Sequence, residues 1–404
     1  MLTRRHLGRM AGILVLTGFG MPGAAIAQQP PVKVGELNSY SRFAAFAVPY
    51  RNGIQLAESE INAKGGVLGG RKLEFVIRDD GATPGDAVRV AEELLTRENV
   101  SFLVGTFLSN IGLAVADFAN QKKTLFIASE PLSDAITMAA GNPYTYRIRP
   151  GTFMQTRMLV DAVKAKGVKR WAIVAPNYEY GQSAAASFKR LIKEANPAAE
   201  IVVEQYPALG KVDAGATVSA IAAANPDGIF NVLFGADLPA FVREGNTRGL
   251  FKDRTVVSLL TGEPEYLLPL KDETPAGWIV TGYPWEQIDT PAHKAFVEAY
   301  RAKFNDTPRL GSFLGYVVVH MVRDLINKAG STDTDKLRAA FDGMTFETLV
   351  GKATMRASDH QLSLGAWVGE LAQKDGQGVM KNWKYVDGEA MMFSETDVAA
   401  AKKK

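Results

Sequence analysis

The amino-acid sequence predicts an α/β fold built from two doubly wound, Rossmann-like lobes. Two observations lead to this prediction. Short, continuous apolar runs alternate with amphipathic helical patterns, and a proline–glycine run divides the apolar runs into two sets. The length of 404 residues is enough for two domains with sizeable cores, and the composition, 47% hydrophobic and 22% charged, is that of a globular protein.

The expected strands are apolar runs of the kind that parallel sheets bury on both faces. The first set lies at 32–37, 73–78, 101–106 and 124–129. The second set lies at 170–175, 200–205, 228–234, 255–260 and 277–282. The run "YRIRPGTF" at 146–153 separates the sets, and we expect the chain to cross there from one lobe to the other.

Amphipathic stretches lie between the strands. In the first of them Ile54, Ala57 and Ile61 share one helical face, and the same period recurs at 87–95. Further helices are expected at 183–195, 291–304 and 312–330. Strand–helix alternation of this kind is typical of a parallel sheet that helices cover.

The stretch "EINAKGGVLGGRKLEFVIRDD" at 60–80 is rich in glycine and raises the question of a phosphate-binding loop. Its order is helix, glycine turn, strand, so Gly65 and Gly66 are predicted to end a helix rather than to begin one. A phosphate cradle needs the opposite order, and Arg71 and Lys72 stand where a P-loop has lysine and serine or threonine. The pattern therefore speaks against a nucleotide ligand.

Residues 1–27 are typical of an export signal. Arg4, Arg5 and Arg9 precede the apolar run 11–20, which is too short to span a bilayer, and "AIA" at 25–27 matches a cleavage site. We expect cleavage after Ala27. The arginine pair leaves twin-arginine export open, and an uncleaved membrane anchor is the alternative interpretation. The chain has no cysteine, which excludes a lipoprotein anchor.

Loss of this signal removes three of the 46 basic residues and leaves 43, equal to the 43 acidic residues. The balance does not favour a nucleic acid or an anionic membrane as partner. The four histidines are scattered without metal-ligand spacing, and no nucleophile motif is present. The sequence thus predicts no metal, no cofactor and no catalytic site, and binding is favoured over catalysis.

Ligands of open α/β sheets bind beyond the carboxyl ends of the strands. The segments there are rich in small polar and aromatic residues: 38–46, 105–112, 128–133, 175–183, 234–239, 259–266 and 281–287. Ser109 and Asn110 stand where a helix begins, so their side chains and the nearby N–H groups can receive a carboxylate. The alternative is that Ser109 only caps the helix and that the aromatic residues only pack the lobes together.

The run "GIQLAESEINAKGGVLGGRKLEFVIRDDGATPGDAVRVAEELL", with "SFLVGT" and "VAPNYEYGQSAAASFKRLIKE", resembles the leucine/isoleucine/valine-binding family. These are the type I periplasmic solute-binding proteins of ABC importers. The resemblance implies two lobes joined by three crossovers, a small-molecule ligand in the cleft, membrane permease subunits as partners and a monomer in the periplasm. We place lobe 1 at 28–149 with 282–355 and lobe 2 at 150–281 with 356–404.

The resemblance also implies roles for individual residues. Ser109 matches the serine that binds the ligand carboxylate, Tyr180 matches a tyrosine that covers the ligand, and Glu263 lies near the acid that pairs with an α-ammonium group. The loops of the aromatic wall contain Tyr40 or Phe43 and Tyr283 or Trp285. The full set of candidate ligand-binding residues is Tyr40, Phe43, Phe107, Ser109, Asn110, Glu130, Ser133, Tyr178, Tyr180, Ala236, Asp237, Thr261, Glu263, Tyr283 and Trp285.

The sequence departs from the family pattern in ways that leave the ligand open. Ala82 and Leu108 stand where many relatives have a disulfide, and "SEPLS" at 129–133 replaces a threonine-rich segment. An amino acid, an aromatic carboxylate and an amide or urea are all retained as ligand classes. Two other functions are retained beside the importer receptor: a sensing subunit that acts through a membrane receptor, and a secreted hydrolase, which the missing motifs disfavour.

Overall fold

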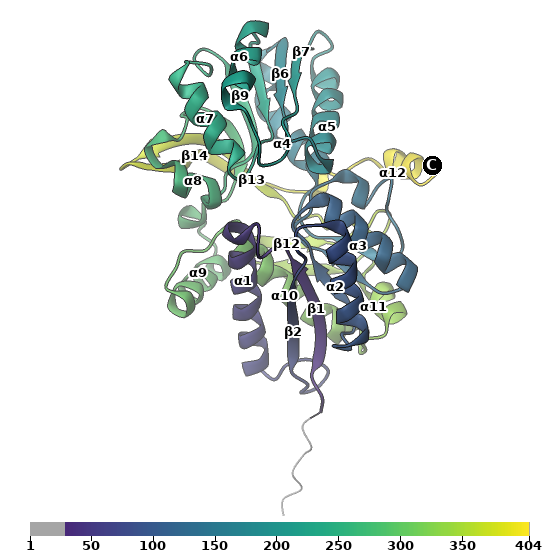
Figure 1. Cartoon of the computed structure of the whole chain (residues 1–404). Coiled ribbons are helices and arrows are strands. Elements are labelled where there is room, and N and C mark those ends of the chain that lie inside the picture. Colours follow the sequence, from purple (N-terminus) through teal and green to yellow (C-terminus); the bar gives the residue numbers. More distant parts are fainter. Residues whose placement is uncertain (1–28, 404) are drawn as a thin grey trace, which may run out of the picture.

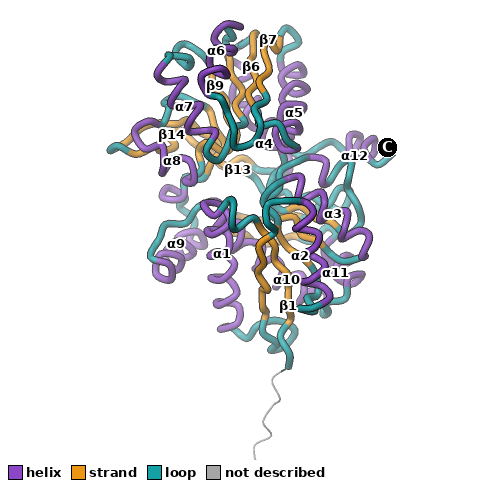
Figure 2. The backbone as a smooth tube through the Cα atoms, in the orientation of Figure 1, coloured by secondary structure: helices purple, strands orange, loops and turns teal. Residues whose placement is uncertain are grey.

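The computed structural model describes residues 29–403, so the predicted export signal at 1–27 lies outside the described residues. This part of the chain forms two α/β lobes, one above the other in Figure 1. In Figure 2 the strands of each lobe run between helices, as the strand–helix alternation predicts. None of the helices described combines the length and the apolarity needed to cross a bilayer.

The first lobe, lower in Figure 1, is built on a parallel sheet with the strand order β2-β1-β3-β4-β5. Its strands are β1 Val32–Asn38, β2 Leu73–Asp79, β3 Leu103–Gly105, β4 Phe126–Ala128 and β5 Thr145–Arg147. Its helices are α1 Ala44–Ala63, α2 Pro84–Thr96, α3 Ser109–Lys122, α9 Pro291–Phe304, α10 Leu310–Ala329 and α11 Thr334–Phe341. The short hairpin of β11 Thr345–Thr348 and β12 Gly351–Thr354 packs beside α10.

The second lobe has a seven-stranded sheet with the order β14-β13-β10-β9-β8-β6-β7. Its strands are β6 Arg170–Val174, β7 Glu200–Gln205, β8 Gly228–Asn231, β9 Thr255–Gly262, β10 Ile279–Gly282, β13 Ala366–Lys374 and β14 Gln377–Val386. Its helices are α4 Thr152–Val163, α5 Glu179–Ala195, α6 Ala214–Ala224, α7 Asp237–Thr247 and α8 Pro264–Leu270. The C-terminal helix α12, Glu395–Ala401, is tied to α5 by an ion pair between Arg190 and Asp397.

The chain crosses between the lobes three times: after β5, after β10 and after β12. The first and third crossovers run side by side. The Arg147 N–H donates to the His360 carbonyl at 2.8 Å, and the Leu362 N–H donates to the Arg147 carbonyl at 2.9 Å. The backbone of the first crossover is therefore held by the third, and the lobes are joined along one edge.

All nine strands expected from the apolar runs are present, with bounds that shift by a few residues. The exceptions to the sequence prediction lie elsewhere. Strand β5 overlaps the start of the proline–glycine run that was expected to be only a crossover, and β11 to β14 were not predicted. Helix α1 also begins at Ala44, well before the predicted apolar face, and it includes Pro49.

The glycine-rich turn follows the end of α1, as predicted. Gly65 and Gly66 have φ of 104° and 72°, and the Gly66 N–H donates to the Ile61 carbonyl at 2.9 Å. A Cβ on Gly66 would lie 2.0 Å from the Arg71 carbonyl oxygen. Glycine is thus required here by a left-handed backbone and by close contact with the Arg71 backbone, and the turn is a helix C-terminal cap.

Candidate functional site

A small cavity lies at the junction of the two lobes, and we call it the inner chamber. The first lobe and its crossover line it with Phe107, Ser109, Glu130, Leu132 and Arg149. The second lobe lines it with Tyr178, Tyr180, Phe234 and Leu260. Its volume is about 20 Å³, room for about one water molecule. In this conformation the side chains of the two lobes therefore nearly fill the chamber.

A larger cleft of about 600 Å³, which we call the outer cleft, adjoins the chamber and shares Tyr178 and Phe234 with it. Phe43 and Phe46, at the start of α1, line it from the first lobe, and Ala236 lines it from the second. The inner chamber and the outer cleft are thus neighbouring parts of one interlobe site.

The chamber residues come from the carboxyl ends of the parallel strands. Ser109 follows β3, Glu130 follows β4 and Arg149 follows β5. In the second lobe Tyr180 follows β6 and Phe234 follows β8. Because the ends of parallel strands meet at one sheet edge, each lobe presents such loops to the other.

Ser109 is 2% exposed and begins α3. The backbone N–H groups of Leu132 and Ser133 donate to its Oγ at 3.2 and 3.1 Å. These two bonds occupy the acceptor positions of the hydroxyl, so its proton is left to donate. Ser109 therefore presents a hydrogen-bond donor at the chamber, and it does not cap α3, whose N-cap is Leu108 without a side-chain cap bond.

Tyr180 and Asn110 carry buried polar atoms without a partner. Within residues 29–403 no hydrogen bond reaches Tyr180 Oη or Asn110 Oδ1. Tyr180 is 2% exposed and lines the inner chamber, and Asn110 lines the outer cleft. Burial raises the pKa of Tyr180, so its phenol keeps its proton at neutral pH. An unpartnered buried hydroxyl is costly to folding, and this cost marks a site where a ligand can supply the partner.

Arg149, 5% exposed, reaches the chamber from the first crossover and pairs with Glu263. Burial alone lowers the pKa of Arg149, but the Glu263 and Glu130 carboxyls outweigh burial and raise it. Burial raises the pKa of Glu263, and Arg149 opposes this shift. Glu263 does not line the chamber; it lines a separate small cavity that shares Arg149 with it.

Glu130 is a second buried carboxyl beside Arg149. It is 3% exposed, and Asn38 Nδ2 donates to its Oε2 at 2.9 Å. Burial raises the pKa of Glu130 to about 8, so the carboxyl is mainly protonated at neutral pH. Burial also raises the pKa of Glu265, whose Oε1 accepts from the Gly311 N–H at 3.2 Å. One guanidinium therefore lies among several buried acids, and burial raises the pKa of each of them.

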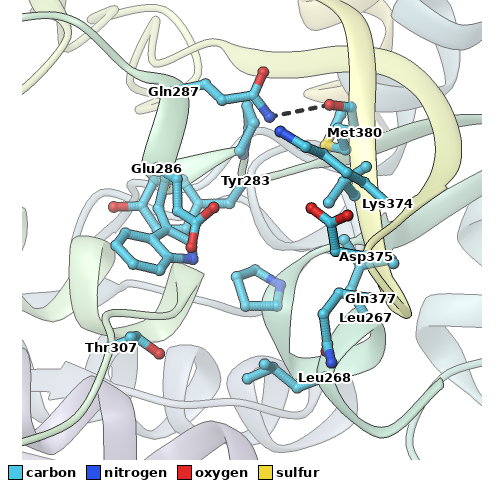
Figure 3. A pocket seen from close by; sticks show the side chains of 15 residues that line it. Leu267, Leu268, Tyr283, Glu286, Gln287, Thr307, Lys374, Asp375, Gln377 and Met380 are labelled. Carbon is cyan, nitrogen blue, oxygen red and sulfur yellow. Dashed lines mark hydrogen bonds between the residues drawn. The ribbon is translucent and has the colours of Figure 1, made fainter. Parts of the chain in front are cut away.

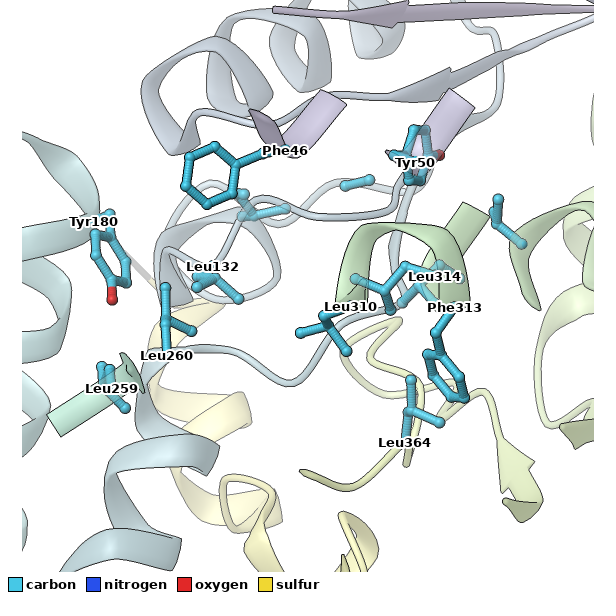
Figure 4. Close-up of a cluster of buried hydrophobic side chains, with 14 of the residues drawn as sticks. Phe46, Tyr50, Leu132, Tyr180, Leu259, Leu260, Leu310, Phe313, Leu314 and Leu364 are labelled. Carbon is cyan, nitrogen blue, oxygen red and sulfur yellow. The ribbon is translucent and has the colours of Figure 1, made fainter. Parts of the chain in front are cut away.

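Aromatic rings from both lobes meet at the site. The Phe107 ring lies 6.1 Å from the Phe234 ring at an interplanar angle of 69°, and the Tyr180 ring lies 5.8 Å from Phe234 at 86°. These are edge-to-face arrangements, which aromatic pairs favour. Figure 4 shows Leu132 and Leu260 near Tyr180, with Phe46 from α1 above them. The chamber thus combines polar donors with an apolar, ring-lined wall.

Polar contacts hold the lobes together beside the chamber. Ser133 Oγ donates to Glu179 Oε1 at 2.5 Å, from the first lobe to the second. Asp134 begins the short helix η1, Asp134–Ile136, and its carboxylate accepts from Ser183 and Ser187 of α5 at 3.2 and 2.8 Å. Each of these bonds joins the two lobes in the closed arrangement.

The structure brings most of the predicted residues to the site. The candidates that line the inner chamber or the outer cleft are Phe43, Phe107, Ser109, Asn110, Glu130, Tyr178, Tyr180 and Ala236. Glu263 does not line either cavity, but it pairs with Arg149, which lines the inner chamber. Ser133 supports Ser109 through its backbone.

Three other candidates are engaged in structural bonds. Tyr40 Oη donates to Glu36 Oε2 at 2.8 Å, and Thr261 Oγ1 lies 2.6 Å from Ser258 Oγ. Asp237 accepts from the Gly210 and Val212 N–H groups at 2.7 and 3.1 Å, so it fixes the loop at the rim of the outer cleft. None of the three lines the chamber or the cleft.

Tyr283 and Trp285 line a different cavity, of about 330 Å³, between α8 and the β13–β14 hairpin. Figure 3 shows Tyr283 there with Leu267 of α8 and Lys374 of the hairpin. Tyr283 is 1% exposed, and its Oη lies 2.6 Å from His293 Nε2. The structure therefore places these two aromatic residues outside the chamber and the cleft, in contrast to the aromatic wall expected from the sequence.

Sequence reasoning missed four residues of the chamber: Leu132, Arg149, Phe234 and Leu260. Leu132, Phe234 and Leu260 lie in segments that were singled out, 128–133, 234–239 and 259–266, but they were not named as candidates. The available signal for Arg149 was a second arginine directly before Pro150 at the crossover. Among the described residues no cluster of histidine, aspartate and glutamate is arranged to hold a metal ion.

Two α/β lobes that enclose a polar, ring-lined chamber at their junction define a two-lobed solute-binding protein. The family model for periplasmic binding proteins matches residues 31–377, and the chain belongs to this family. Among curated proteins it is similar to Leu/Ile/Val-binding protein homolog 7 of Brucella suis, with 26% identity over 361 residues, 85% of this chain and 88% of the relative.

Solved structures share the fold. One is a solute-binding protein of an ABC transporter from Rhodopseudomonas palustris BisB5 in complex with 3,4-dihydroxybenzoic acid, with a TM-score of 0.78, 24% identity and coverage of 89% of this chain and 98% of that one. Another is the leucine-, isoleucine-, valine-, threonine- and alanine-binding protein of Brucella ovis in a closed conformation, with a TM-score of 0.78, 19% identity and coverage of 90% and 97%.

Proposed function

We propose that this protein is the exported solute receptor of an ABC importer of the branched-chain amino acid type. It binds a small carboxylate, an amino acid or an aromatic acid, between its lobes and delivers it to permease subunits as a monomer in the periplasm. The observation that supports this most is that the buried hydroxyl of Tyr180, which has no partner among residues 29–403, lines the same chamber as Ser109 of the other lobe.

The ligand binds between the two lobes, which open to admit it and close on it. In the closed conformation the inner chamber has room for about one water, so a ligand enters when the lobes separate. Closure on the ligand then supplies partners to Ser109 and Tyr180 and buries its apolar part among the rings. A ligand shifts the equilibrium to the closed form because only that form offers contacts from both lobes at once.

A thermal-shift and calorimetry screen of the protein without residues 1–27 tests the proposal. The panel contains L-leucine, L-phenylalanine, benzoate, 4-hydroxybenzoate, acetamide and urea. We expect at least one carboxylate to raise the melting temperature with concentration, since a ligand of the folded state stabilises it by mass action. If no carboxylate binds at millimolar concentration, the proposed function is wrong, and binding of only acetamide or urea would reassign the ligand class.

Transport itself is tested in a strain from which the gene is deleted. Uptake of the radiolabelled ligand should be lost and restored by the full chain. Normal uptake with a lost transcriptional or behavioural response to the ligand would identify a sensing subunit instead.

A further inference from the structure

We infer that Arg149 is the carboxylate receptor of the inner chamber, and that its pairing with Glu263 selects monocarboxylates without an α-ammonium group, aromatic acids above all, over amino acids. This inference rests on the proposed function and names the substrate class of the same site. It comes from the hydrogen-bond partners, charges and positions of three side chains.

The guanidinium of Arg149 has N–H donors that no acceptor of the described residues meets. An arginine side chain carries five N–H donors. Among the described residues Arg149 uses its Nη2 on Glu263, and no protein acceptor meets its Nε or Nη1. Arg147, two residues earlier, is the opposite case: Gln361, Thr137 and the carbonyls of Leu132 and Ser133 all accept from it. Arg147 is a structural arginine, whereas Arg149 faces the chamber with unused donors.

The position of Glu263 argues against an ammonium ligand. The family pattern places an acid near the ammonium, but here Arg149 lines the chamber and Glu263 lies beyond it in the next cavity. If Glu263 is ionised, Arg149 neutralises it. If Glu263 is protonated, the chamber carries the charge of Arg149 alone. In either state an ammonium group gains no attraction, and a carboxylate is favoured.

Glu130, the acid that lines the chamber, does not reverse this preference for a carboxylate over an ammonium group. Glu130 is held by Asn38, and its pKa is influenced by the charges of Glu265, which raises it, and Arg149, which lowers it. Burial raises its pKa to about 8, so it contributes little negative charge at neutral pH. The Ser109 proton and the Tyr180 hydroxyl add neutral donors for the same carboxylate.

The opposite wall fits a planar ring. Phe107 and Phe234 belong to different lobes, and Tyr178 lies 6.0 Å from Phe234 at 47°. When the lobes separate, a flat aromatic acid can enter among these rings with its carboxylate toward Arg149. The Rhodopseudomonas palustris structure that shares this fold holds 3,4-dihydroxybenzoic acid, which belongs to the class inferred here from the residues of this chain.

Matched ligand pairs test the selection in the unmodified protein. Calorimetry compares L-phenylalanine with 3-phenylpropanoate and L-leucine with 4-methylpentanoate, since the members of each pair differ only in the α-ammonium group. Benzoate is added as the small aromatic acid. We expect benzoate or a deaminated acid to bind at least roughly tenfold more tightly than both amino acids. An amino acid that binds more tightly than its deaminated counterpart would overturn the inference while the proposed function stands. Failure of all five to bind would overturn the inference, and the proposed function would then depend on the remaining carboxylate of the wider panel, 4-hydroxybenzoate.

Variants assign the roles. Arg149→Met combined with Glu263→Met removes both charges and keeps the volume, because loss of only one partner leaves an unpaired buried charge. We expect carboxylate affinity to fall roughly 10- to 150-fold, the effect of losing a charged hydrogen bond. Arg356→Met is the control, since Arg356 also pairs with an acid, Asp359, and does not line the chamber.

Glu263→Gln tests whether Glu263 binds a ligand ammonium group, as the family pattern implies, or only pairs with Arg149. This test does not require the double variant to fold. It frees Arg149, so binding of benzoate or 3-phenylpropanoate should be unchanged or tighter. If the variant instead loses amino-acid binding more than tenfold, Glu263 is an ammonium receptor and the inference is wrong.

Discussion

The Ser187 hydroxyl of α5 donates a hydrogen bond of 2.8 Å to the Asp134 carboxylate, which belongs to the other lobe. The same carboxylate accepts from the Phe153 N–H at the start of α4 at 2.9 Å. Asp134 therefore links the first lobe to two helices of the second. These bonds stabilise the arrangement of the two lobes seen in this structure.

Ser187→Ala is expected to weaken ligand binding without unfolding either lobe. The variant loses one interlobe hydrogen bond, worth about 0.5–1.5 kcal/mol, while Asp134 keeps its other partners. Because the lost bond stabilises the closed form, the dissociation rate of the ligand should rise, which stopped-flow fluorescence measures. Ser219→Ala, an exposed serine on α6 of the same lobe, serves as the control and should leave the rate unchanged.

Tyr180→Phe should separate binding from stability. The change removes an Oη that has no partner among the described residues, so the free energy of unfolding of the ligand-free protein should stay the same or rise. Ligand affinity should fall by roughly 1–3 kcal/mol, because the ligand loses a buried partner. Urea denaturation and calorimetry give the two quantities. A large loss of stability with unchanged affinity would show that Tyr180 is only a core residue.

Ser109→Ala is expected to reduce both the ligand affinity and the stability of the ligand-free protein. In the proposed complex its hydroxyl donates to the ligand. It also accepts from the Leu132 and Ser133 N–H groups, which lose their partner in the variant. We expect a loss of affinity of roughly 1–3 kcal/mol, measured by calorimetry, and a lower melting temperature. Unchanged affinity in both this variant and Tyr180→Phe would contradict the placement of the ligand in the inner chamber.

Stability should depend on pH through Glu130. Its pKa is about 8 in the folded protein, against an ordinary value of 4.5, because burial disfavours the charged form. Between these values the folded state holds a proton that the unfolded chain releases, so the free energy of unfolding falls as pH rises from about 4.5 to about 8. In Glu130→Gln this contribution is absent. Urea denaturation at several pH values should give a flatter profile than the wild type, and parallel profiles would refute the assignment.

Trp285→Ala should leave ligand affinity unchanged, although the sequence places Trp285 in the aromatic wall. The structure puts it in the cavity of Figure 3, beside α8 and the β13–β14 hairpin. Tyr178→Ala is the matched comparison, since Tyr178 lines both the chamber and the cleft, and it should weaken binding. Calorimetry with the same ligand decides between the two placements.

Much of the architecture was predictable because it depends on local pattern. The nine apolar runs became strands, most of them buried within the sheets, although β7 lies at a sheet edge and has no buried residue. Helix α9 has the predicted bounds, Pro291–Phe304. The C-terminal hairpin was not predictable in this way. Strand β14 is only partly buried, with many exposed polar residues, so its sequence carries no continuous apolar run.

The candidate site was predictable where chain order decides it and unpredictable where contacts decide it. Loops after parallel strands must meet at the sheet edge, so Ser109, Glu130 and Tyr180 could be placed from sequence alone. Arg147 and Arg149 could not be told apart, because they occupy the same short run before Pro150. Only the folded chain surrounds Arg147 with four acceptors and leaves Arg149 beside the chamber, since those acceptors come from distant segments.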